Sequence, residues 1–431
     1  MKYFGTDGIR GKVNDTLTPD IAYRLGRSLV ALGGSQIVIA TDTRASKDEL
    51  FSLIAGGAMA MGLDVIDAGI MPTPALIYYS GLKKITGVMV TASHNPYYDN
   101  GIKVLDKGEK LSEAKELEIE ALMDCSDVAY SFKVGRLIRD IDCKSAYISM
   151  LMKYTSKTKK KIALDCANGA TFETAPYVFK QMGEVVVCAN NPDGYNINKG
   201  VGSTNLDNLS KFVVANKCDY GFAFDGDGDR VLACDCKGNH IDGDMLIYIL
   251  GTKLYQEGRL KHNQIVFTCM SNLGMINRLH KMGIKTSITP VGDKYVVREL
   301  LDNGYSVGGE ASGHIIMPDL LKTGDGTLIA LNLVKILEDT SFSELIGDIM
   351  LYPETLTNLK VKNKQVCELK EVKERVKEIK ELLGQDSKVF IRPSGTEDLL
   401  RITVSAPNLD DVNKYTEELK ASVLSYTEVK E

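Results

Sequence analysis

The sequence predicts an α/β fold made of three similar domains with mixed sheets, followed by a smaller α+β domain. Two observations lead to this prediction. Short apolar runs rich in β-branched residues alternate with longer amphipathic stretches along most of the chain, which is typical of α/β proteins. In addition, one strand–helix–strand pattern occurs three times before the character of the sequence changes near residue 362.

The three copies of this pattern begin with expected strands at 36–44, 161–170 and 264–272. Each is followed by a helical stretch that ends in Met-Gly, at Gly62, Gly183 and Gly283. Glycine readily takes the left-handed conformation that ends many helices. Each copy then closes with a polar loop after a strand, "TASHNP", "DGDGDR" and "GEASGH" in turn. Because ligands collect at the carboxyl ends of strands in open α/β sheets, these loops are expected to share one central cleft.

The last part of the chain predicts a different, smaller domain. A helix is expected within 369–384, with Val372, Val376, Ile379 and Leu383 on one face. Residues 388–406 predict two strands around a turn, and residues 408–426 predict a closing helix. We therefore expect four domains, at 1–153, 154–252, 253–362 and 363–431, with "YTSKTKKK" (154–161) as a linker.

Composition indicates an ordinary globular protein of 431 residues, 44% apolar and 25% charged. The net charge of −5 does not favour binding to nucleic acid or to anionic membranes. No apolar run approaches the ~18 residues of a membrane span, and "MKYFGTDGIRG" lacks the apolar core of a signal peptide. Nine cysteines without a CxxC pair predict thiols in a reduced interior. We expect a cytoplasmic protein, either a monomer or a homodimer.

Asp225, Asp227 and Asp229 alternate with glycines in "DGDGDR", directly after the apolar run "YGFAF". Three carboxylates this close repel one another unless a cation lies between them, and oxygen ligands favour Mg²⁺ or Ca²⁺. An EF-hand does not fit, because Arg230 stands where its glycine is required. Mg²⁺ usually keeps positions for phosphate oxygens. No Walker A motif is present, because Val13 follows the lysine of "GTDGIRGK". The loop therefore predicts phosphoryl chemistry without a nucleotide triphosphate donor.

Ser93 lies in "VTASHNP", just after the apolar run "GVMV". It is not in a G-x-S-x-G elbow, because Thr91 and Asn95 occupy the flanking positions. His94 is its neighbour, and adjacent side chains of an extended chain point in opposite directions, so a Ser–His dyad is not expected. The local sequence alone leaves Ser93 as either a nucleophile or a turn residue.

A phosphate-binding turn is predicted in "RPSGTE" (392–397). It combines Arg392, the hydroxyls of Ser394 and Thr396, and Gly395, and Arg401 follows on the next expected strand. Backbone N–H groups and guanidinium groups aimed at one point suit a dianion. A plain Pro-Ser-Gly turn is the alternative.

A sugar-binding segment is predicted in "GGEASGH" (308–314). Glu310, Ser312 and His314 occupy alternate positions, which places them on one side of an extended segment. A carboxylate and a hydroxyl suit a pair of vicinal sugar hydroxyls, although His314 is equally compatible with a structural role.

Taken together, "TASHNP", "DGDGDR", "GEASGH" and "RPSGTE" resemble the four signature loops of the α-D-phosphohexomutase superfamily, in order and one per domain. Within it, "FGTDGIRG", "GGEASGHII" and "TGDGTLIALNLV" (323–334) are most similar to the phosphoglucosamine mutase branch. The phosphomannomutase/phosphoglucomutase branch usually has Met in place of Ala311. The resemblance implies interconversion of glucosamine 6-phosphate and glucosamine 1-phosphate, which feeds UDP-N-acetylglucosamine and cell-wall precursor synthesis.

The resemblance also implies roles for individual residues. A phosphoserine at Ser93 would react, surrounded by His94, Lys103 and Arg10. One Mg²⁺ per chain would be held by Asp225, Asp227, Asp229 and the Ser93 phosphate. The phosphorylated hexosamine would contact Glu310, Ser312, His314, Lys294 and Arg230. Its second phosphate would be held by Arg392, Ser394, Gly395, Thr396 and Arg401. A hexose 1,6-bisphosphate would be the intermediate and activator. Lys294 departs from the arginine typical of the branch and loses its bidentate fork.

Several alternatives remain open at this point. Either Lys103 or His94 would accept the proton of the sugar hydroxyl. The sister specificity, phosphomannomutase/phosphoglucomutase, is the closest alternative function. A haloacid-dehalogenase-like phosphatase would use Asp225 as its nucleophile, although Asp229 departs from that motif. A non-catalytic phosphosugar sensor on the same fold is the remaining alternative function.

Overall fold

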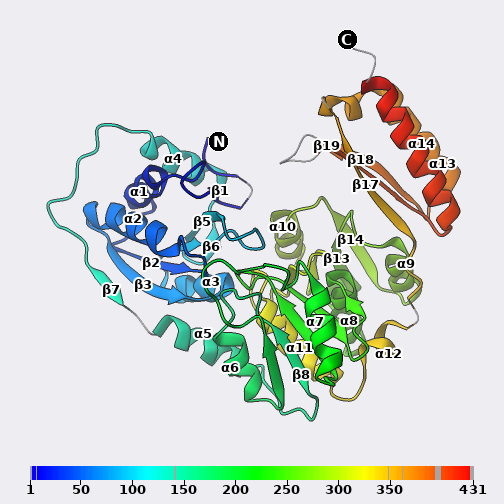
Figure 1. The fold of residues 1–431 in the computed structure, drawn as a ribbon, viewed down its shortest axis with the longest axis horizontal. Helices are drawn as coiled ribbons and strands as arrows, with labels where there is room; N and C mark the ends of the chain where they lie inside the picture. The colour runs from blue at the N-terminus through cyan, green and yellow to red at the C-terminus, as the bar shows by residue number, and fades with distance from the viewer. Residues whose placement is uncertain are drawn as a thin grey trace. The chain divides into compact units, whose positions relative to one another are not determined.

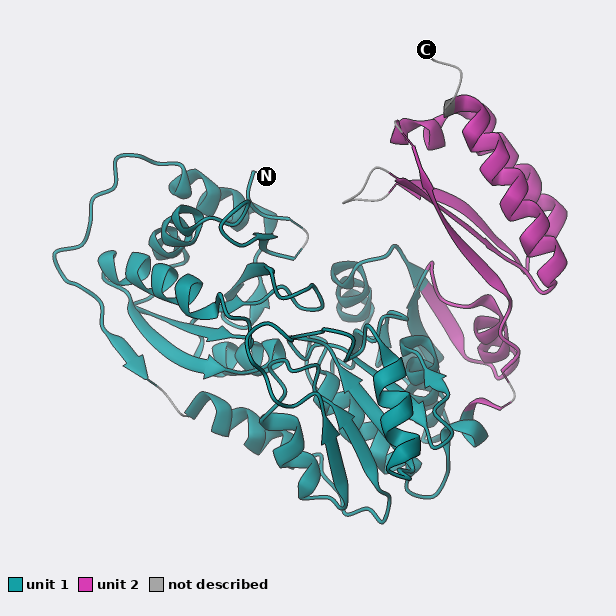
Figure 2. Cartoon of the chain, in the orientation of Figure 1, with its two compact units in different colours: residues 1–268, 288–345 teal, residues 269–287, 346–431 magenta. Residues whose placement is uncertain are grey.

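The computed structural model describes residues 2–5, 7–139, 142–347, 349–361, 363–393 and 399–427. The chain forms two compact units, residues 1–268 with 288–345 and residues 269–287 with 346–431 (Figure 2). The boundary between them crosses β14 (Lys285–Thr289), so part of the predicted third domain clusters with the C-terminal residues. The limits of the four domains remain a prediction.

The N-terminal part of unit 1 holds a seven-stranded mixed sheet in the order β1-β5-β4-β2-β3-β7, with β6 beside β5 (Figure 1). Its strands are β1 (Ile9–Lys12), β2 (Gln36–Thr41), β3 (Asp64–Ile70), β4 (Thr86–Val90), β5 (Asp99–Asp106), β6 (Glu109–Lys110) and β7 (Leu137–Arg139). Its helices are α1 (Pro19–Ser28), η1 (Leu29–Leu32), α2 (Lys47–Ala60), α3 (Thr73–Lys83) and α4 (Glu113–Met123). Strand β2 pairs in parallel with β3 and β4, whereas β5 is antiparallel to β1 and β4.

Helices α1, α2 and α4 share one core with the apolar residues on one side of this sheet. The crossing of α1 and α2 requires glycine in both helices. A Cβ atom at Gly26 would lie 2.1 Å from the carbonyl oxygen of Ile54, and one at Gly57 would lie 2.4 Å from that of Tyr23. The absence of side chains at these two positions allows the close backbone approach.

The second sheet of unit 1 has five strands in the order β12-β11-β10-β8-β9 and is also mixed. Its strands are β8 (Ile162–Asp165), β9 (Val185–Cys188), β10 (Tyr220–Phe224), β11 (Val231–Asp235) and β12 (His240–Ile241). The helices of this part are α5 (Asp142–Met152), α6 (Thr174–Lys180) and α7 (Leu206–Ala215). The "DGDGDR" loop connects β10 to its antiparallel neighbour β11.

A third group of elements completes unit 1. Strand β13 (Gln264–Thr268) pairs in parallel with β15 (Gly308–Gly309), which forms a hairpin with β16 (Ile315–Ile316). The surrounding helices are α8 (Gly243–Gln256), η2 (Lys261–Asn263), α10 (Asp293–Asn303) and α11 (Gly326–Leu337). Helix α12 (Phe342–Ile346) follows at the boundary between the units.

Unit 2 contains an antiparallel sheet in the order β17-β19-β18. Its elements are α9 (Leu273–Lys281), β17 (Glu354–Lys360), η3 (Lys364–Glu368), α13 (Lys370–Leu383), β18 (Lys388–Pro393), β19 (Leu399–Ser405) and α14 (Leu409–Thr427). Helices α13 and α14 pack on one side of the sheet, and Val372 and Ile379 of α13 are buried there. This arrangement confirms the expected helix, strand pair and closing helix.

The predicted helix ends are confirmed at two of the three Met-Gly pairs. Gly62 and Gly283 have left-handed φ angles of 87° and 82°. The prediction is wrong for Gly183, which does not have a left-handed φ angle, because α6 already ends at Lys180. A Cβ atom at Gly183 would lie 2.7 Å from the carbonyl oxygen of Thr158, so glycine serves a close backbone approach there.

All nine cysteines are free thiols, and five of them are buried. Among the helices that the structure describes, none is long and apolar enough to cross a lipid bilayer.

Candidate active site

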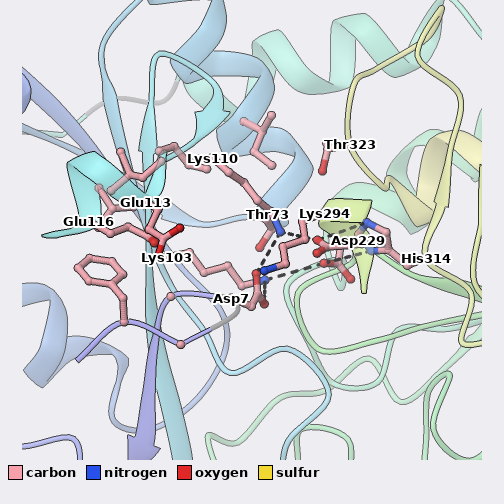
Figure 3. A pocket seen from close by; sticks show the side chains of 18 residues that line it. Asp7, Thr73, Lys103, Lys110, Glu113, Glu116, Asp229, Lys294, His314 and Thr323 are labelled. Atoms are coloured by element: carbon pink, nitrogen blue, oxygen red, sulfur yellow. Dashed lines mark hydrogen bonds and ion pairs between the residues drawn. The ribbon is translucent and has the colours of Figure 1, made fainter. Parts of the chain in front are cut away.

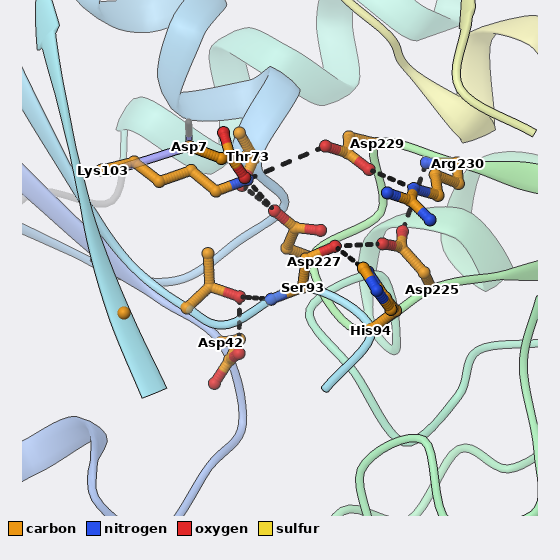
Figure 4. A network of polar contacts seen from close by, with 12 residues as sticks. Asp7, Asp42, Thr73, Ser93, His94, Lys103, Asp225, Asp227, Asp229 and Arg230 are labelled. Atoms are coloured by element: carbon orange, nitrogen blue, oxygen red, sulfur yellow. Dashed lines mark hydrogen bonds and ion pairs between the residues drawn. The ribbon is translucent and has the colours of Figure 1, made fainter. Parts of the chain in front are cut away.

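Ser93 lies just beyond the carboxyl end of β4 and is 1% exposed. Its hydroxyl donates to Oδ2 of Asp225 at 2.7 Å and lies 3.3 Å from Nδ1 of His94 (Figure 4). The expectation that Ser93 and His94 point apart is therefore wrong. Ser93 has a left-handed φ of 51°, so the rule for extended chains does not apply.

Arg44 holds the Ser93 loop through several hydrogen bonds. Its fully buried guanidinium pairs with Asp42 at 2.9 Å and donates to the carbonyl oxygens of Ser93 at 3.0 Å and Asn95 at 2.8 Å. It also donates to the carbonyl oxygens of Pro96 and Asp99. One side chain thus binds four carbonyl groups of a single loop.

Two further contacts fasten the same loop. Oγ1 of Thr91 donates to Asp42 at 2.7 Å and accepts the Ser93 backbone N–H at 2.9 Å. The Asn198 amide, from the second sheet region, donates to the Ser93 carbonyl oxygen at 2.8 Å. A Cβ atom at Gly226 would lie 2.4 Å from that oxygen, so the first glycine of "DGDGDR" allows the two loops to touch.

The three aspartates of "DGDGDR" converge as the sequence predicts. Asp225, Asp227 and Asp229 are buried, and one carboxylate oxygen from each lies within 4.8 Å of the others. Oδ1 of Asp227 and Oδ1 of Asp229 are buried without a hydrogen-bond partner among the described residues. Buried, unpaired carboxylate oxygens fit a hard divalent cation.

The pKa shifts of Asp225 and Asp229 also fit a cation between the carboxylates. Burial, together with the charges of Asp229 and Asp227, raises the pKa of Asp225 well above its usual value. Burial also opposes ionisation of Asp229, yet His314, Lys103 and Arg230 hold its pKa well below the usual value. A bound cation would offset the repulsion that contributes to the raised pKa of Asp225.

Lys103 extends from β5 into the same cluster. Its Nζ lies 2.9 Å from Asp227, 3.0 Å from Asp7 and 3.8 Å from Asp229. Burial disfavours its charge, but these three carboxylates raise the pKa of Lys103 above its usual value. The hydroxyl of Thr73 also donates to Asp227, at 2.6 Å.

Two further basic residues lie nearby: Arg10, predicted near the reacting phosphoryl group, and Arg230, predicted to contact the hexosamine. Arg10, on β1, forms an ion pair with Asp7, and Nε of Arg230 lies 3.8 Å from Asp229. Burial, followed by the charges of Arg230 and Arg10, lowers the pKa of His94 to about 4.

The "GGEASGH" segment forms a tight hairpin turn between β15 and β16, so the prediction of an extended segment is wrong. Gly313 takes a left-handed φ of 92° and its N–H donates to the Glu310 carbonyl oxygen at 2.9 Å. Glu310 and Ser312 still meet, with 3.4 Å between Oε2 and Oγ. His314 is 4% exposed and instead lies 3.6 Å from Asp229.

A cavity of about 620 Å³ opens beside the aspartate cluster (Figure 3). Lys103, Asp229, His314 and Lys294 are among the residues that line it. The exposed Lys294 has its Nζ 5.1 Å from the centre of the Tyr295 ring. Predicted catalytic, metal-binding and sugar-binding residues therefore line one cavity within unit 1.

The predicted phosphate turn lies in unit 2. Ser394, Gly395 and Thr396 fall outside the described residues. Arg392 of β18 and Arg401 of β19 stand directly opposite each other, and the Nε atom of each is buried without a hydrogen-bond partner in the described part of the chain.

The N-terminal segment that carries Asp7 and Arg10 is anchored by Glu120 of α4. The Glu120 carboxylate accepts the backbone N–H groups of Lys2, Tyr3 and Phe4 at 2.6–2.9 Å. Burial opposes its ionisation, but these three hydrogen bonds lower the pKa of Glu120 below its usual value.

Replacing Glu120 with Gln is therefore expected to lower the free energy of unfolding by about 1–3 kcal/mol and to reduce kcat. Because the folded-state pKa is depressed, this contribution is present above the usual glutamate pKa of 4.5 and disappears as pH falls through the folded-state pKa. Urea unfolding of both proteins between pH 7 and pH 3 measures the effect. A difference that stays constant over this range contradicts the prediction. Glu118→Gln, on the same helix, is the control.

Sequence reasoning missed several residues of the site. Asp42 and Arg44 follow the buried strand β2 directly, and this position could have marked them as candidates for the site. Thr73 and Asn198 had none, because they reach the site only through the packing of separate elements.

Four consecutive regions of the chain match the domains of one family. The matches are to the phosphoglucomutase/phosphomannomutase α/β/α domains I (residues 1–128), II (145–238) and III (242–352) and to its C-terminal domain (356–422). A protein from Anoxybacillus flavithermus named phosphoglucosamine mutase is 41% identical over 98% of each chain. The chain belongs to the phosphoglucomutase/phosphomannomutase family. A second relative with the same name, from Geobacillus kaustophilus, is also 41% identical, over 97% of each chain.

Solved structures of phosphoglucomutase/phosphomannomutase family members share the fold. A family protein from Burkholderia thailandensis aligns with a TM-score of 0.83 at 22% identity, covering 99% of this chain and 98% of that one. The N-acetylphosphoglucosamine mutase of Aspergillus fumigatus, solved with GlcNAc-6P and magnesium, aligns with a TM-score of 0.71 at 16% identity, covering 99% and 96%. The predicted fold and superfamily are confirmed, and the haloacid-dehalogenase alternative is excluded.

Proposed function

We propose that this protein is a phosphoglucosamine mutase, an isomerase that interconverts glucosamine 6-phosphate and glucosamine 1-phosphate. The observation that carries the proposal is the contact of Ser93 with the buried aspartate cluster, 132 residues away in the sequence. Relatives about 40% identical over the whole chain bear the name of this activity.

Ser93 is the phosphoryl carrier in this proposal. The phosphorus–Oγ bond of phospho-Ser93 breaks while a new bond forms to O1 of glucosamine 6-phosphate. The proton of the sugar hydroxyl passes to His94, which borders the aspartate cluster and has a lowered pKa. Lys103, the other candidate, already carries its proton because three carboxylates raise its pKa. The 1,6-bisphosphate then turns end for end, and Ser93 takes back the phosphoryl group from O6. The released product is glucosamine 1-phosphate.

Charge stabilisation is the main contribution of the surrounding residues. Asp225, Asp227 and Asp229 would hold one Mg²⁺, which as a Lewis acid neutralises charge on the transferring phosphoryl group. Lys103 and Arg10 contribute positive charge to the same cluster. Glu310 and Ser312 orient the sugar through its hydroxyls.

Arg392 and Arg401 bind the phosphate that does not react. Like charges directly opposite each other destabilise an antiparallel strand pair, and a bound dianion would compensate this repulsion. Ser394, Gly395 and Thr396 complete this site in the proposal.

The test is to incubate the protein with Mg²⁺, a trace of glucose 1,6-bisphosphate and glucosamine 6-phosphate, and to detect glucosamine 1-phosphate. Absence of product would exclude the proposed activity and leave the sensor alternative. Comparison of kcat/KM on glucosamine, glucose and mannose 6-phosphates decides between this specificity and phosphomannomutase/phosphoglucomutase.

Mg²⁺ is expected to raise the melting temperature, because binding to the folded state alone stabilises it by about 2.7 kcal/mol at 100 times Kd. Asp227→Asn should abolish most of this Mg²⁺-dependent shift, measured by scanning calorimetry with and without the ion. Asp207→Asn, a substitution of an exposed aspartate on α7, is the matched control and should retain the shift. An equal shift in both variants would contradict the assignment of the aspartates to the metal.

A further inference from the structure

Six side chains that line the cavity form a closed ring in which carboxylates alternate with basic groups. In order they are Lys103, Asp7, Lys110, Asp293, His314 and Asp229. Successive members are 3.0 Å (Lys103–Asp7), 3.4 Å (Asp7–Lys110), 4.0 Å (Asp293–His314), 3.6 Å (His314–Asp229) and 3.8 Å (Asp229–Lys103) apart, and Lys110 forms an ion pair with Asp293. We call this set the cavity ring.

Of the three carboxylates in the cavity ring, Asp293 is the one that can still accept a hydrogen bond from a ligand. Asp229 belongs to the proposed metal site, and Asp7 is already surrounded by Lys103, Lys110 and Arg10. In the described part of the chain, Lys110 is the one basic group that pairs closely with Asp293. On its other side Nε2 of His314 is 4.0 Å away, which is too far for a hydrogen bond.

His314 provides a second, independent indication of a ligand. It is 4% exposed, and its Nε2 has no hydrogen-bond partner among the described residues. Buried polar atoms in proteins are normally hydrogen-bonded. A ligand group placed between Asp293 and His314 would satisfy both side chains from within the cavity.

The position of Asp293 relative to the sugar follows from its neighbour. The Gly292 N–H donates to Oε1 of Glu310 at 2.8 Å, so the loop that precedes Asp293 is fastened to the residue proposed to bind sugar hydroxyls. Burial opposes ionisation of Asp293, but Lys110 and His314 hold its pKa below the usual value. At neutral pH a carboxylate therefore stands beside the proposed sugar site.

We propose that Asp293 binds the C2 ammonium group of the substrate and thereby selects hexosamine phosphates over hexose phosphates. The inference rests on the proposed function. It assigns to Asp293 the recognition of the C2 substituent, which distinguishes glucosamine from glucose. A hydrogen bond between two charged groups is stronger than one to a neutral hydroxyl. A sugar with a hydroxyl at C2 would leave the Asp293 charge less well compensated.

The experiment compares wild type, Asp293→Asn and Asp302→Asn on glucosamine 6-phosphate and glucose 6-phosphate. For Asp293→Asn we expect the ratio of the two kcat/KM values to fall roughly 10- to 100-fold toward glucose. Asp302→Asn removes an exposed carboxylate on the same helix, which pairs with Arg298 at 3.3 Å, and should keep the wild-type ratio. In addition, KM for glucosamine 6-phosphate should rise in wild type as the amine loses its proton, and this rise should be absent in Asp293→Asn.

A parallel loss on both sugars in Asp293→Asn would overturn the inference, because it would show that Asp293 only supports Lys110 and His314. Titration calorimetry with Ser93→Ala and Ser93→Ala/Asp293→Asn gives the same ratio from dissociation constants, without turnover. Failure of catalysis therefore does not obscure the result. A binding preference for glucosamine 6-phosphate that survives Asp293→Asn also contradicts the inference.

Discussion

Replacing Ser93 with alanine is expected to lower kcat by roughly 10³- to 10⁶-fold, as is typical for loss of a covalent nucleophile. The variant should remain folded, because the loop is held by its carbonyl groups and not by the Ser93 hydroxyl. Intact-mass measurement after incubation with glucose 1,6-bisphosphate should show one phosphoryl group on wild type and none on Ser93→Ala.

Ser28→Ala provides the matched control for this change. Ser28 is 2% exposed and its hydroxyl donates to carbonyl oxygens within α1, away from the aspartate cluster. This variant should keep its activity and its phosphoryl group. A phosphopeptide that maps to another residue, or full activity of Ser93→Ala, would refute the assignment of the phosphoryl carrier.

Replacing Arg44 with methionine is expected to have the second largest effect. The substitution leaves Asp42 buried without its ion-pair partner and frees four carbonyl oxygens of the Ser93 loop. Breaking a buried ion pair on one side costs about 3–5 kcal/mol. A displaced nucleophile loop costs roughly 10²-fold or more in rate.

The effect of Arg44 on protein stability can be separated from its effect on the position of the Ser93 loop. Activity should be measured well below the melting temperature of each variant, with KM and kcat determined separately. We expect kcat to fall more than KM changes, because the loop positions the transferred group and not the sugar. Millimolar guanidinium ion should restore part of the activity of Arg44→Ala, whereas urea should not.

Arg136→Met is the control for the Arg44 variants. Arg136 is 77% exposed and pairs with Asp64 at 2.9 Å on the surface, so its loss should leave stability close to that of wild type. Wild-type kcat in a folded Arg44→Met protein would contradict the positioning role.

Several features of the site followed from the sequence because they depend on neighbouring residues. Asp225, Asp227 and Asp229 lie within a stretch of five residues, so their carboxylates stay close together in any conformation of the chain. The prediction that they hold a cation rests on that spacing. The strand before them and the strands β18 and β19 also follow from local patterns of apolar residues.

The errors of prediction have local physical causes. The contact of Ser93 with His94 depends on a left-handed φ at a serine, which sequence patterns do not reveal. The "GGEASGH" loop was expected to be extended, but Gly313 turns it into a hairpin that sends His314 toward Asp229. In both cases one backbone angle redirects a side chain.

The alternation of strands and helices and the family follow from the residue patterns of the chain alone. Which loops meet depends on how the folded elements pack. Ser93 reaches Asp225 because the loop that follows β4 contacts the loop that follows β10. Gly226 allows the two backbones to approach closely. Arg44, Asn198 and Asp293 acquire their places in the same way. Local patterns follow from the preferences of adjacent residues, whereas these contacts join residues far apart and depend on the packing of whole elements.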